Sequence, residues 1–179
     1  EEDANIKIAA KRIAMTKFSN AGQMCVAPDY VLVHESRKEE LIAGLKKSIH
    51  GFFGDKPEDS GNYGKIINGK QFDRLVKYLQ QGQLIHGGRN DKEKLFIEPT
   101  VISNVSLDAD IMKDEIFGPI LPVISFSSKA EALKIIAQNK NPLAFYVFTS
   151  SSAKEKDWLN SVAFGGGCIN NASWHLTNH

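Results

Sequence analysis

Between residues 4 and 18 the hydrophobic positions recur at intervals of three and four, with basic residues between them. This spacing predicts an amphipathic helix over residues 4–18, and Asp3 stands where its N-cap is expected. Ser36, followed at the third position by Glu39, has the pattern of a capping box and predicts a second helix that ends near His50. The same periodicity predicts further helices over residues 69–81, 130–138 and 153–160.

Short apolar runs lie between these helices and predict strands. They cover residues 29–34, 83–86, 95–98, 120–126, 145–149 and 166–170. Residues 51–67 are expected to form a loop, because glycine and proline are too dense there for regular structure, and residues 99–114 are expected to be irregular. Alternating strands and helices favour an α/β fold with a largely parallel sheet. Its centre is expected to hold the strands near residues 30, 121, 146 and 168.

The composition is that of one ordinary globular domain. The chain has 179 residues, of which 42% are hydrophobic and 24% charged, and its 22 basic and 21 acidic side chains leave a net charge of +1. No basic stripe favours a nucleic-acid partner, and no apolar run approaches the roughly 18 residues of a membrane-spanning segment. The acidic start does not have the pattern of a signal peptide. Because the chain starts without Met inside a predicted helix, we expect it to be a piece of a longer protein.

Cys25 is the residue to which we assign the chemistry of the chain. It lies between the first predicted helix and the strand at 29–34, where Gly22 frees the backbone and Pro28 prevents a continuous helix. A junction of this kind can direct a side chain into a cleft. On local sequence alone, the alternative is that Cys25 is a small buried hydrophobic residue, as most free cysteines are.

The other cysteine, Cys168, is expected to lie in the core of the last strand. Two cysteines so far apart do not exclude one disulfide, but they give no framework, and we expect a reducing, cytoplasmic location. No group of His, Cys, Asp and Glu has the spacing of a metal site. The sequence selects none of its five histidines as a base for Cys25, which disfavours a Cys–His hydrolase.

Residues 20–25 read Asn-Ala-Gly-Gln-Met-Cys and resemble the nucleophile motif of the aldehyde dehydrogenase superfamily. The next five residues, Val-Ala-Pro-Asp-Tyr, are similar to the sequel of that motif in the class 3-like branch, which acts on fatty and aromatic aldehydes. Three further segments match the family in the same order, at residues 63–68, 115–122 and 165–171. The resemblance covers essentially the whole chain, and four ordered motifs make it specific.

The resemblance implies a three-layer α/β/α domain and a reaction. Residues 1–179 would be the thiol-bearing catalytic domain, with a dinucleotide-binding domain before it and a tail after it. The Cys25 thiolate would add to an aldehyde, and the oxyanion would be held by the Cys25 N–H and an asparagine. Hydride transfer to NAD or NADP would leave a thioester, which a water activated by a glutamate would hydrolyse. Because that asparagine and that glutamate lie outside this chain, the fragment alone is expected to be inactive.

Glu115 and Phe117 match the Glu-x-Phe-Gly-Pro motif of the family. The resemblance implies that the Glu115 carboxylate accepts hydrogen bonds from the hydroxyls of the nicotinamide ribose, with the Phe117 ring packed beside it. Without the resemblance, Glu115 would be a solvated loop charge and Phe117 a core residue ahead of the Gly-Pro step. The glycines at 165–167 lack the spacing of a phosphate-binding loop, and we expect them to let the backbone pass close to the site.

Two other functions of the same fold remain open from the sequence. A CoA-acylating aldehyde dehydrogenase would pass the thioester to coenzyme A, and a non-catalytic domain would use the fold as a scaffold. The main hypothesis expects a small-molecule aldehyde as substrate and a homodimer as the intact protein.

Overall fold

Five α-helices and eight strands alternate along the part of the chain that the computed structural model describes, residues 1–176. The helices are α1 (Ile6–Phe18), α2 (Lys38–Phe53), α3 (Gly69–Tyr78), α4 (Lys129–Ile136) and α5 (Ser152–Ser161). The strands are β1 (Val31–His34), β2 (Gln83–His86), β3 (Asn90–Asp91), β4 (Phe96–Ile97), β5 (Thr100–Ser103), β6 (Ile120–Phe126), β7 (Ala144–Val147) and β8 (Gly166–Ile169). Short 3₁₀ turns connect several of these elements. Most of the predicted helices and strands lie close to their expected ranges.

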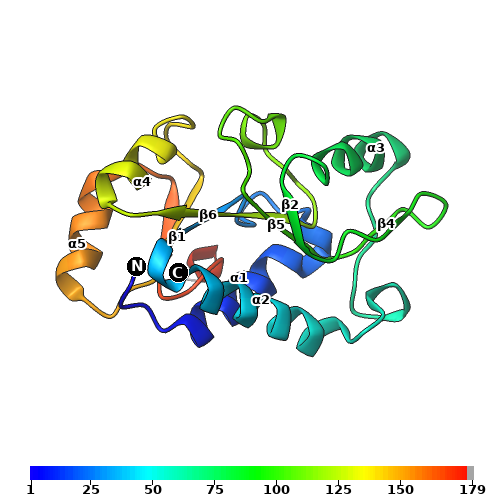
Figure 1. Cartoon of the computed structure of the whole chain (residues 1–179), viewed down its shortest axis with the longest axis horizontal. Coiled ribbons are helices and arrows are strands. Elements are labelled where there is room, and N and C mark those ends of the chain that lie inside the picture. Colours follow the sequence, from blue (N-terminus) through cyan, green and yellow to red (C-terminus); the bar gives the residue numbers. More distant parts are fainter. Residues whose placement is uncertain (177–179) are drawn as a thin grey trace.

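The main sheet has four strands in the order β1-β6-β5-β2. β6 pairs in parallel with β1 on one side and with β5 on the other, while β2 pairs antiparallel with β5 at one edge. Helices lie on both sides of this sheet, with α1 and α2 below it and α3 and α4 above it in Figure 1. The predicted α/β fold with a largely parallel sheet and three layers is therefore confirmed.

Alternation along β5 and β6 assigns their side chains to two separate cores. Val101 and Leu121 pack in one core with α1 and α2, whereas Ile102 and Ile120 pack in the other with α3. A third core joins Phe126, at the end of β6, to residues of α4, β7 and α5. Both faces of the central strands are thus buried, as in the sheet of an α/β protein.

The strands near residues 146 and 168 do not join the main sheet, which corrects the predicted single sheet. β7 and β8 form their own parallel pair, with Tyr146 opposite Cys168 in the register. An apolar cavity lies between β7 and the free edge of β1, lined by residues 31–33 of β1 and 144–148 along β7. The two edges are therefore too far apart for the roughly 4.8 Å spacing of paired strands.

The N-caps predicted at Asp3 and Ser36 were assigned to the wrong residue. Asn5 caps α1, since its side chain accepts the N–H of Ile8 at 3.1 Å, while the Asp3 carboxylate accepts hydrogen bonds from Thr149 and Ser150. The Ser36 hydroxyl lies 2.8 Å from Nδ1 of His34, and α2 starts after a 3₁₀ turn without a side-chain cap. In both cases the polar side chain that was expected to cap the helix bonds to another residue instead. For Asp3 that residue is distant in sequence, and for Ser36 it is a near neighbour.

The sequence prediction missed the two-residue strand β3, and it missed β5 because residues 99–114 were expected to be irregular. All four residues of β5 are buried, and Pro99 precedes it directly. The strand ends at Ser103, and the next residue, Asn104, has a left-handed backbone with φ of 52°. Four buried residues between two chain-breaking positions give no alternation from which a strand could be predicted.

Alanine at two glycines of α2 tests how closely this helix packs on α1. A Cβ at Gly44 would lie 2.7 Å from the Cβ of Ala10, whereas a Cβ at Gly51 would meet no atom within 4 Å. Gly44→Ala is expected to destabilise the protein by about 1–3 kcal/mol through overpacking. Gly51→Ala is the matched control and is expected to stabilise it by about 0.5–1 kcal/mol through helix propensity. Thermal unfolding midpoints measure both, and shifts in the same direction would contradict the packing argument.

Candidate active site

Cys25 lies in the turn between α1 and β1, as the sequence predicted. The chain leaves α1 through a 3₁₀ turn in which Asn20, Ala21 and Gly22 have φ angles of 49°, 52° and 73°. These left-handed conformations reverse the chain direction, and the Cys25 side chain is exposed. The structure therefore contradicts the alternative of a buried hydrophobic cysteine and presents the thiol at the surface.

Gln23 attaches this turn to the segment at residues 63–68, the second matching motif. Its side-chain amide donates to the carbonyl of Lys65 at 2.9 Å, and its side-chain oxygen accepts the N–H of Ile67 at 2.9 Å. A Cβ at Gly64 would lie 3.2 Å from the carbonyl carbon of Asn20, so the two backbones pass close together. Two segments more than forty positions apart are thus held by the Gln23 side chain and by a close backbone approach that tolerates little side-chain bulk.

The loop at residues 115–118 packs on the other side of the turn. A Cβ at Gly22 would lie 2.2 Å from the carbonyl oxygen of Gly118, which leaves room for glycine alone. The Asp29 carboxylate accepts the N–H of Ile116 at 3.1 Å, and the Arg74 guanidinium of α3 donates to the Ile116 carbonyl at 2.7 Å. Both backbone groups of Ile116 are therefore held by charged side chains, which fixes the position of the loop.

Glu115 and Phe117, the predicted cofactor residues, flank the buried Ile116 and have exposed side chains. Phe117 is 39% exposed and has a φ of 45°, a conformation that is strained for a bulky residue. The alternative that Phe117 is a core residue is therefore wrong. Strain of this kind persists only where the surroundings impose it, and it concentrates at functional sites.

Three ionisable side chains influence one another beneath this loop. Lys17, in the last turn of α1, is fully buried, and burial lowers its pKa to about 8 although Asp29 and Glu115 act in the opposite direction. Burial also raises the pKa of Asp29. For Glu115, desolvation and then the Asp29 charge raise the pKa, while Lys17 and Arg74 lower it. The ionisation of Glu115 therefore depends on three neighbouring charges.

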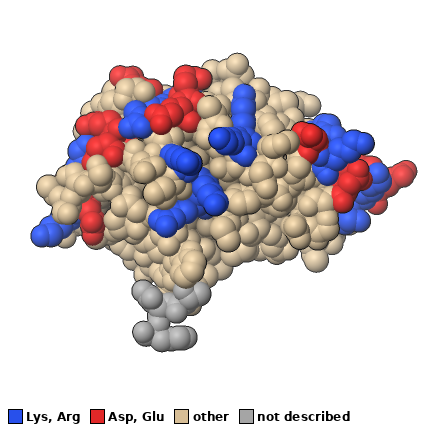
Figure 2. All heavy atoms as spheres, turned by 90° about the horizontal axis from the view of Figure 1, so that it is seen from below, with Lys and Arg blue, Asp and Glu red and all other residues tan. Residues whose placement is uncertain are grey.

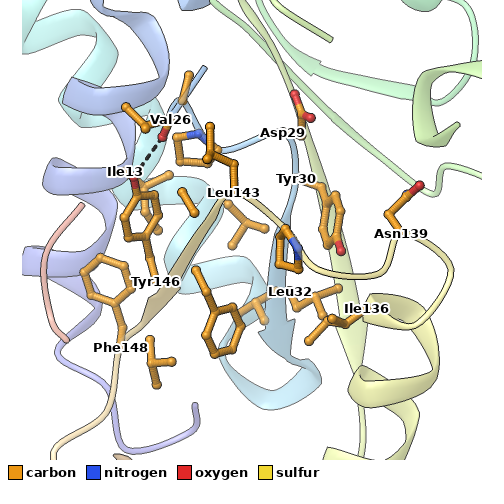
Figure 3. A pocket seen from close by; sticks show the side chains of 18 of the residues that line it. Ile13, Val26, Asp29, Tyr30, Leu32, Ile136, Asn139, Leu143, Tyr146 and Phe148 are labelled. Atoms are coloured by element: carbon orange, nitrogen blue, oxygen red, sulfur yellow. Dashed lines mark hydrogen bonds between the residues drawn. The ribbon is translucent and has the colours of Figure 1, made fainter. Parts of the chain in front are cut away.

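β8 carries the fourth motif and pairs with β7, and β7 contacts the Cys25 turn through Tyr146. The Tyr146 hydroxyl donates to the carbonyl of Val26 at 2.9 Å, the dashed line in Figure 3. Burial raises the pKa of Tyr146 to about 12, so its hydroxyl is a neutral donor at physiological pH. Cys168 lies opposite Tyr146 on β8, is half-buried rather than in the core, and has its Sγ 3.7 Å from Nδ1 of His175. Both cysteines are free thiols.

The cavity between β1 and β7 has a volume of about 520 Å³, and Cys25 lies at its margin. Its walls are mainly apolar side chains, among them Ile13, Leu32 and Phe148 (Figure 3). Asp29 and Asn139 bring polar atoms to its edge. Most of its lining is therefore apolar and separates two strand edges, while Cys25 and Glu115 both belong to its lining.

Charged side chains are spread over the surface of residues 1–176. On the face shown in Figure 2, basic side chains form small separate groups, some of them with acidic side chains beside them, and no continuous basic stripe is visible. Within this range no three His, Cys, Asp or Glu side chains are arranged to hold a metal ion. No helix in it has the length and apolar character needed to cross a membrane.

Sequence reasoning missed Lys17, Arg74 and Tyr146. Lys17 could have been found, because it follows Ile13 by four positions and so falls on the buried face of α1. A lysine at a core position of an amphipathic helix is a signal of a buried charge. Arg74 and Tyr146 gave no such signal, since their partners are backbone carbonyls of distant segments.

Comparison with known proteins gives a consistent result. The family model described as the aldehyde dehydrogenase family matches residues 1–179. The 4,4'-diaponeurosporen-aldehyde dehydrogenase of Staphylococcus aureus is 44% identical over 99% of this chain and 39% of its own length. The dimeric NADP-preferring aldehyde dehydrogenase of Mus musculus is 37% identical over 99% of this chain and 39% of its length. Aldehyde dehydrogenase family 3 member B1 of Homo sapiens is 41% identical over 99% of this chain and 38% of its length.

A solved structure of the substrate-bound state of Staphylococcus aureus AldH superimposes with a TM-score of 0.96 at 43% sequence identity. The match covers 99% of this chain and 39% of that one. These findings confirm the resemblance that the four motifs indicated. The chain spans about two fifths of the length of these relatives.

Alanine at Gly22 tests the contact between the thiol-bearing turn and the loop. Gly22→Ala would combine a left-handed backbone with a Cβ 2.2 Å from Gly118 O, and is expected to destabilise the protein on the order of 3 kcal/mol. Gly61→Ala is the matched control, because a Cβ there meets no atom within 4 Å. The thermal unfolding midpoint measures both. A Gly22→Ala midpoint equal to that of the Gly61 control would show that the close approach is absent.

Proposed function

The chain belongs to the aldehyde dehydrogenase family, and we propose that it is the catalytic domain of an enzyme that oxidises an aldehyde to a carboxylic acid with NAD⁺ or NADP⁺. The observation that carries the proposal is the packing of the exposed Cys25 turn against the loop that presents Glu115 and Phe117. In this arrangement Cys25, the nucleophile, and Glu115, the hydrogen-bond acceptor for the ribose diol, lie on two segments that pack directly against each other. In the proposal, the dinucleotide-binding domain, the general base and the oxyanion asparagine are supplied by other parts of the protein.

The chemistry begins at the Cys25 sulfur. Its thiolate forms a bond to the aldehyde carbon, and the carbonyl electrons move to oxygen, which gives a thiohemiacetal oxyanion. The backbone N–H of Cys25 is the donor that this chain can offer to that oxyanion. The bound nicotinamide supplies a hydride acceptor, and loss of hydride from the carbon converts the thiohemiacetal to a thioester. Attack of water on the thioester releases the carboxylic acid and restores the Cys25 thiol.

Glu115 fits the ribose of such a cofactor. An ionised carboxylate has two acceptor oxygens, and the two ribose hydroxyls are two donors. The exposed side chain of Glu115 has no hydrogen-bond partner of its own among residues 1–176, so its oxygens are free to accept. The cofactor would be held at this point by the fixed loop between Asp29 and Arg74.

The names of two relatives indicate finer features of the proposal. The name of the staphylococcal relative specifies an aldehyde substrate, and the name of the mouse relative specifies a dimer that prefers NADP. We extend to this protein a small-molecule aldehyde, a nicotinamide cofactor and a homodimer. Two free thiols fit a reducing compartment, and we propose a cytoplasmic location.

Replacement of the two cysteines tests the nucleophile in the intact protein. Cys25→Ala is expected to abolish NAD(P)⁺-dependent aldehyde oxidation, because no other thiol can form the thioester at that position. Cys168→Ala is the matched control and is expected to keep most of the activity. Initial rates of NAD(P)H formation measure both variants. Oxidation that persists in Cys25→Ala would remove Cys25 from the mechanism.

Neutralisation of Glu115 tests the cofactor contact. Glu115→Gln replaces a charged acceptor by a neutral one and is expected to weaken NAD(P)⁺ binding roughly 10-fold or more, as for other charge-assisted hydrogen bonds. Asp114→Asn is the matched control, because it removes the same charge from the exposed neighbouring side chain. Titration of the protein with each nucleotide gives the dissociation constants. Equal weakening by both substitutions would indicate a general charge effect and not a contact at Glu115.

A further inference from the structure

Lys17 is a buried side chain whose position the proposed mechanism does not explain. Its residue is fully buried, and its Nζ makes no hydrogen bond within residues 1–176. A buried ammonium without hydrogen bonds is costly, since it has left water without a replacement for its hydration. Buried polar atoms of this kind are rare in native proteins, and each calls for a physical explanation.

Lys17 lies beside the segments that form the candidate site. It occupies the last turn of α1, directly before the turn that presents Cys25. A Cβ at Gly22 would meet both the Gly118 carbonyl and, at 3.1 Å, the Lys17 carbonyl. The end of α1 and the loop at residues 115–118 are therefore in close contact, with the Lys17 ammonium enclosed near their junction.

The charges that act on the Lys17 ammonium are two carboxylates, Asp29 and Glu115. Asp29 is committed to the N–H of Ile116, so its negative charge is fixed beside the loop. Glu115 projects from the neighbouring position of the same loop. The Asp29 charge disfavours the ionised form of Glu115, and the Lys17 charge offsets that effect.

We propose that Lys17 is a positioning residue for the cofactor contact. Its buried ammonium compensates the fixed charge of Asp29 and so keeps Glu115 ionised as an acceptor for the ribose hydroxyls. The inference rests on the proposed function of Glu115. It explains why a position with apolar neighbours on α1 holds a lysine. Methionine would fill a similar volume without the cost of burying a charge, as replacements of buried charges often show.

The test compares two substitutions that remove opposite charges near Glu115. Lys17→Met removes one of the two cations that offset the Asp29 charge, the other being Arg74, so Glu115 should ionise at higher pH. Asp29→Asn keeps an oxygen acceptor for the Ile116 N–H but removes the repulsion, so Glu115 should ionise at lower pH. Arg74 also acts on Glu115 and is unchanged in both variants. The pH dependence of NAD⁺ and NADP⁺ binding should shift in opposite directions, by roughly one unit each.

Dissociation constants of the intact protein for NAD⁺ and NADP⁺ are measured from pH about 3.5 to about 7. This range covers a glutamate shifted in either direction and stays below the pKa of about 8 at which Lys17 loses its charge. Lys17→Met/Asp29→Asn removes both charges and is expected to return the profile close to that of the parent. A structural role for Lys17 alone would weaken binding at every pH without such a shift. That outcome, or shifts in the same direction for both single variants, would overturn the inference.

Glu115→Gln separates this inference from the function on which it rests. If Glu115→Gln binds both nucleotides as tightly as the parent, the cofactor contact itself is wrong, and the role of Lys17 falls with it. If Glu115→Gln weakens binding but Lys17→Met leaves the pH profile unchanged, only the role of Lys17 is wrong. Should Lys17→Met fail to fold, Asp29→Asn decides, since a profile that does not move to lower pH would overturn the inference.

Discussion

The site depends on one close contact, the approach of the Gly22 backbone to the carbonyl of Gly118. It joins the turn that carries Cys25 to the loop that carries Glu115 and Phe117, although more than ninety positions separate the two glycines. Gly118 is restricted as well, because a Cβ there would lie 2.4 Å from the Leu75 side chain of α3. The thiol and the carboxylate thus keep their relative placement through contacts in which no side chain intervenes, and such contacts are stiff because interiors are closely packed.

Charged side chains then hold the loop where the glycines allow it to lie. Asp29 and Arg74 bond the N–H and the carbonyl of Ile116, whose own side chain is buried in the core under α3. This anchoring accounts for the strained backbone of Phe117, because both preceding backbone groups are fixed. The arrangement uses strong hydrogen bonds to position backbone, and it leaves the side chains of Glu115 and Phe117 free toward solvent.

Local sequence predicted the elements of this fold well, because helices and the long strand β6 carry their own periodicity. It also located Cys25 at a helix-to-strand junction, since Gly22 and Pro28 restrict the chain there. The errors came from partners distant in sequence. Asp3 forms hydrogen bonds with residues near 150 and so does not cap α1. β7 is separated from β1 by a cavity, which the periodicity of the sequence does not predict. The resemblance to a family supplied the proposed roles of Glu115 and Phe117, which composition and spacing alone did not.

Lys17 shows most clearly what a pattern can and cannot establish. Its spacing from Ile13 indicates that it lies on the buried face of α1, and this could have been predicted. What it compensates could not, because Asp29 and Glu115 come to it from a turn and a loop that meet only in the folded chain. A buried charge is therefore first visible in a sequence as an exception to the hydrophobic pattern. Its partners, and with them its effect on the ionisation of Glu115, follow only from the tertiary contacts that the glycines permit.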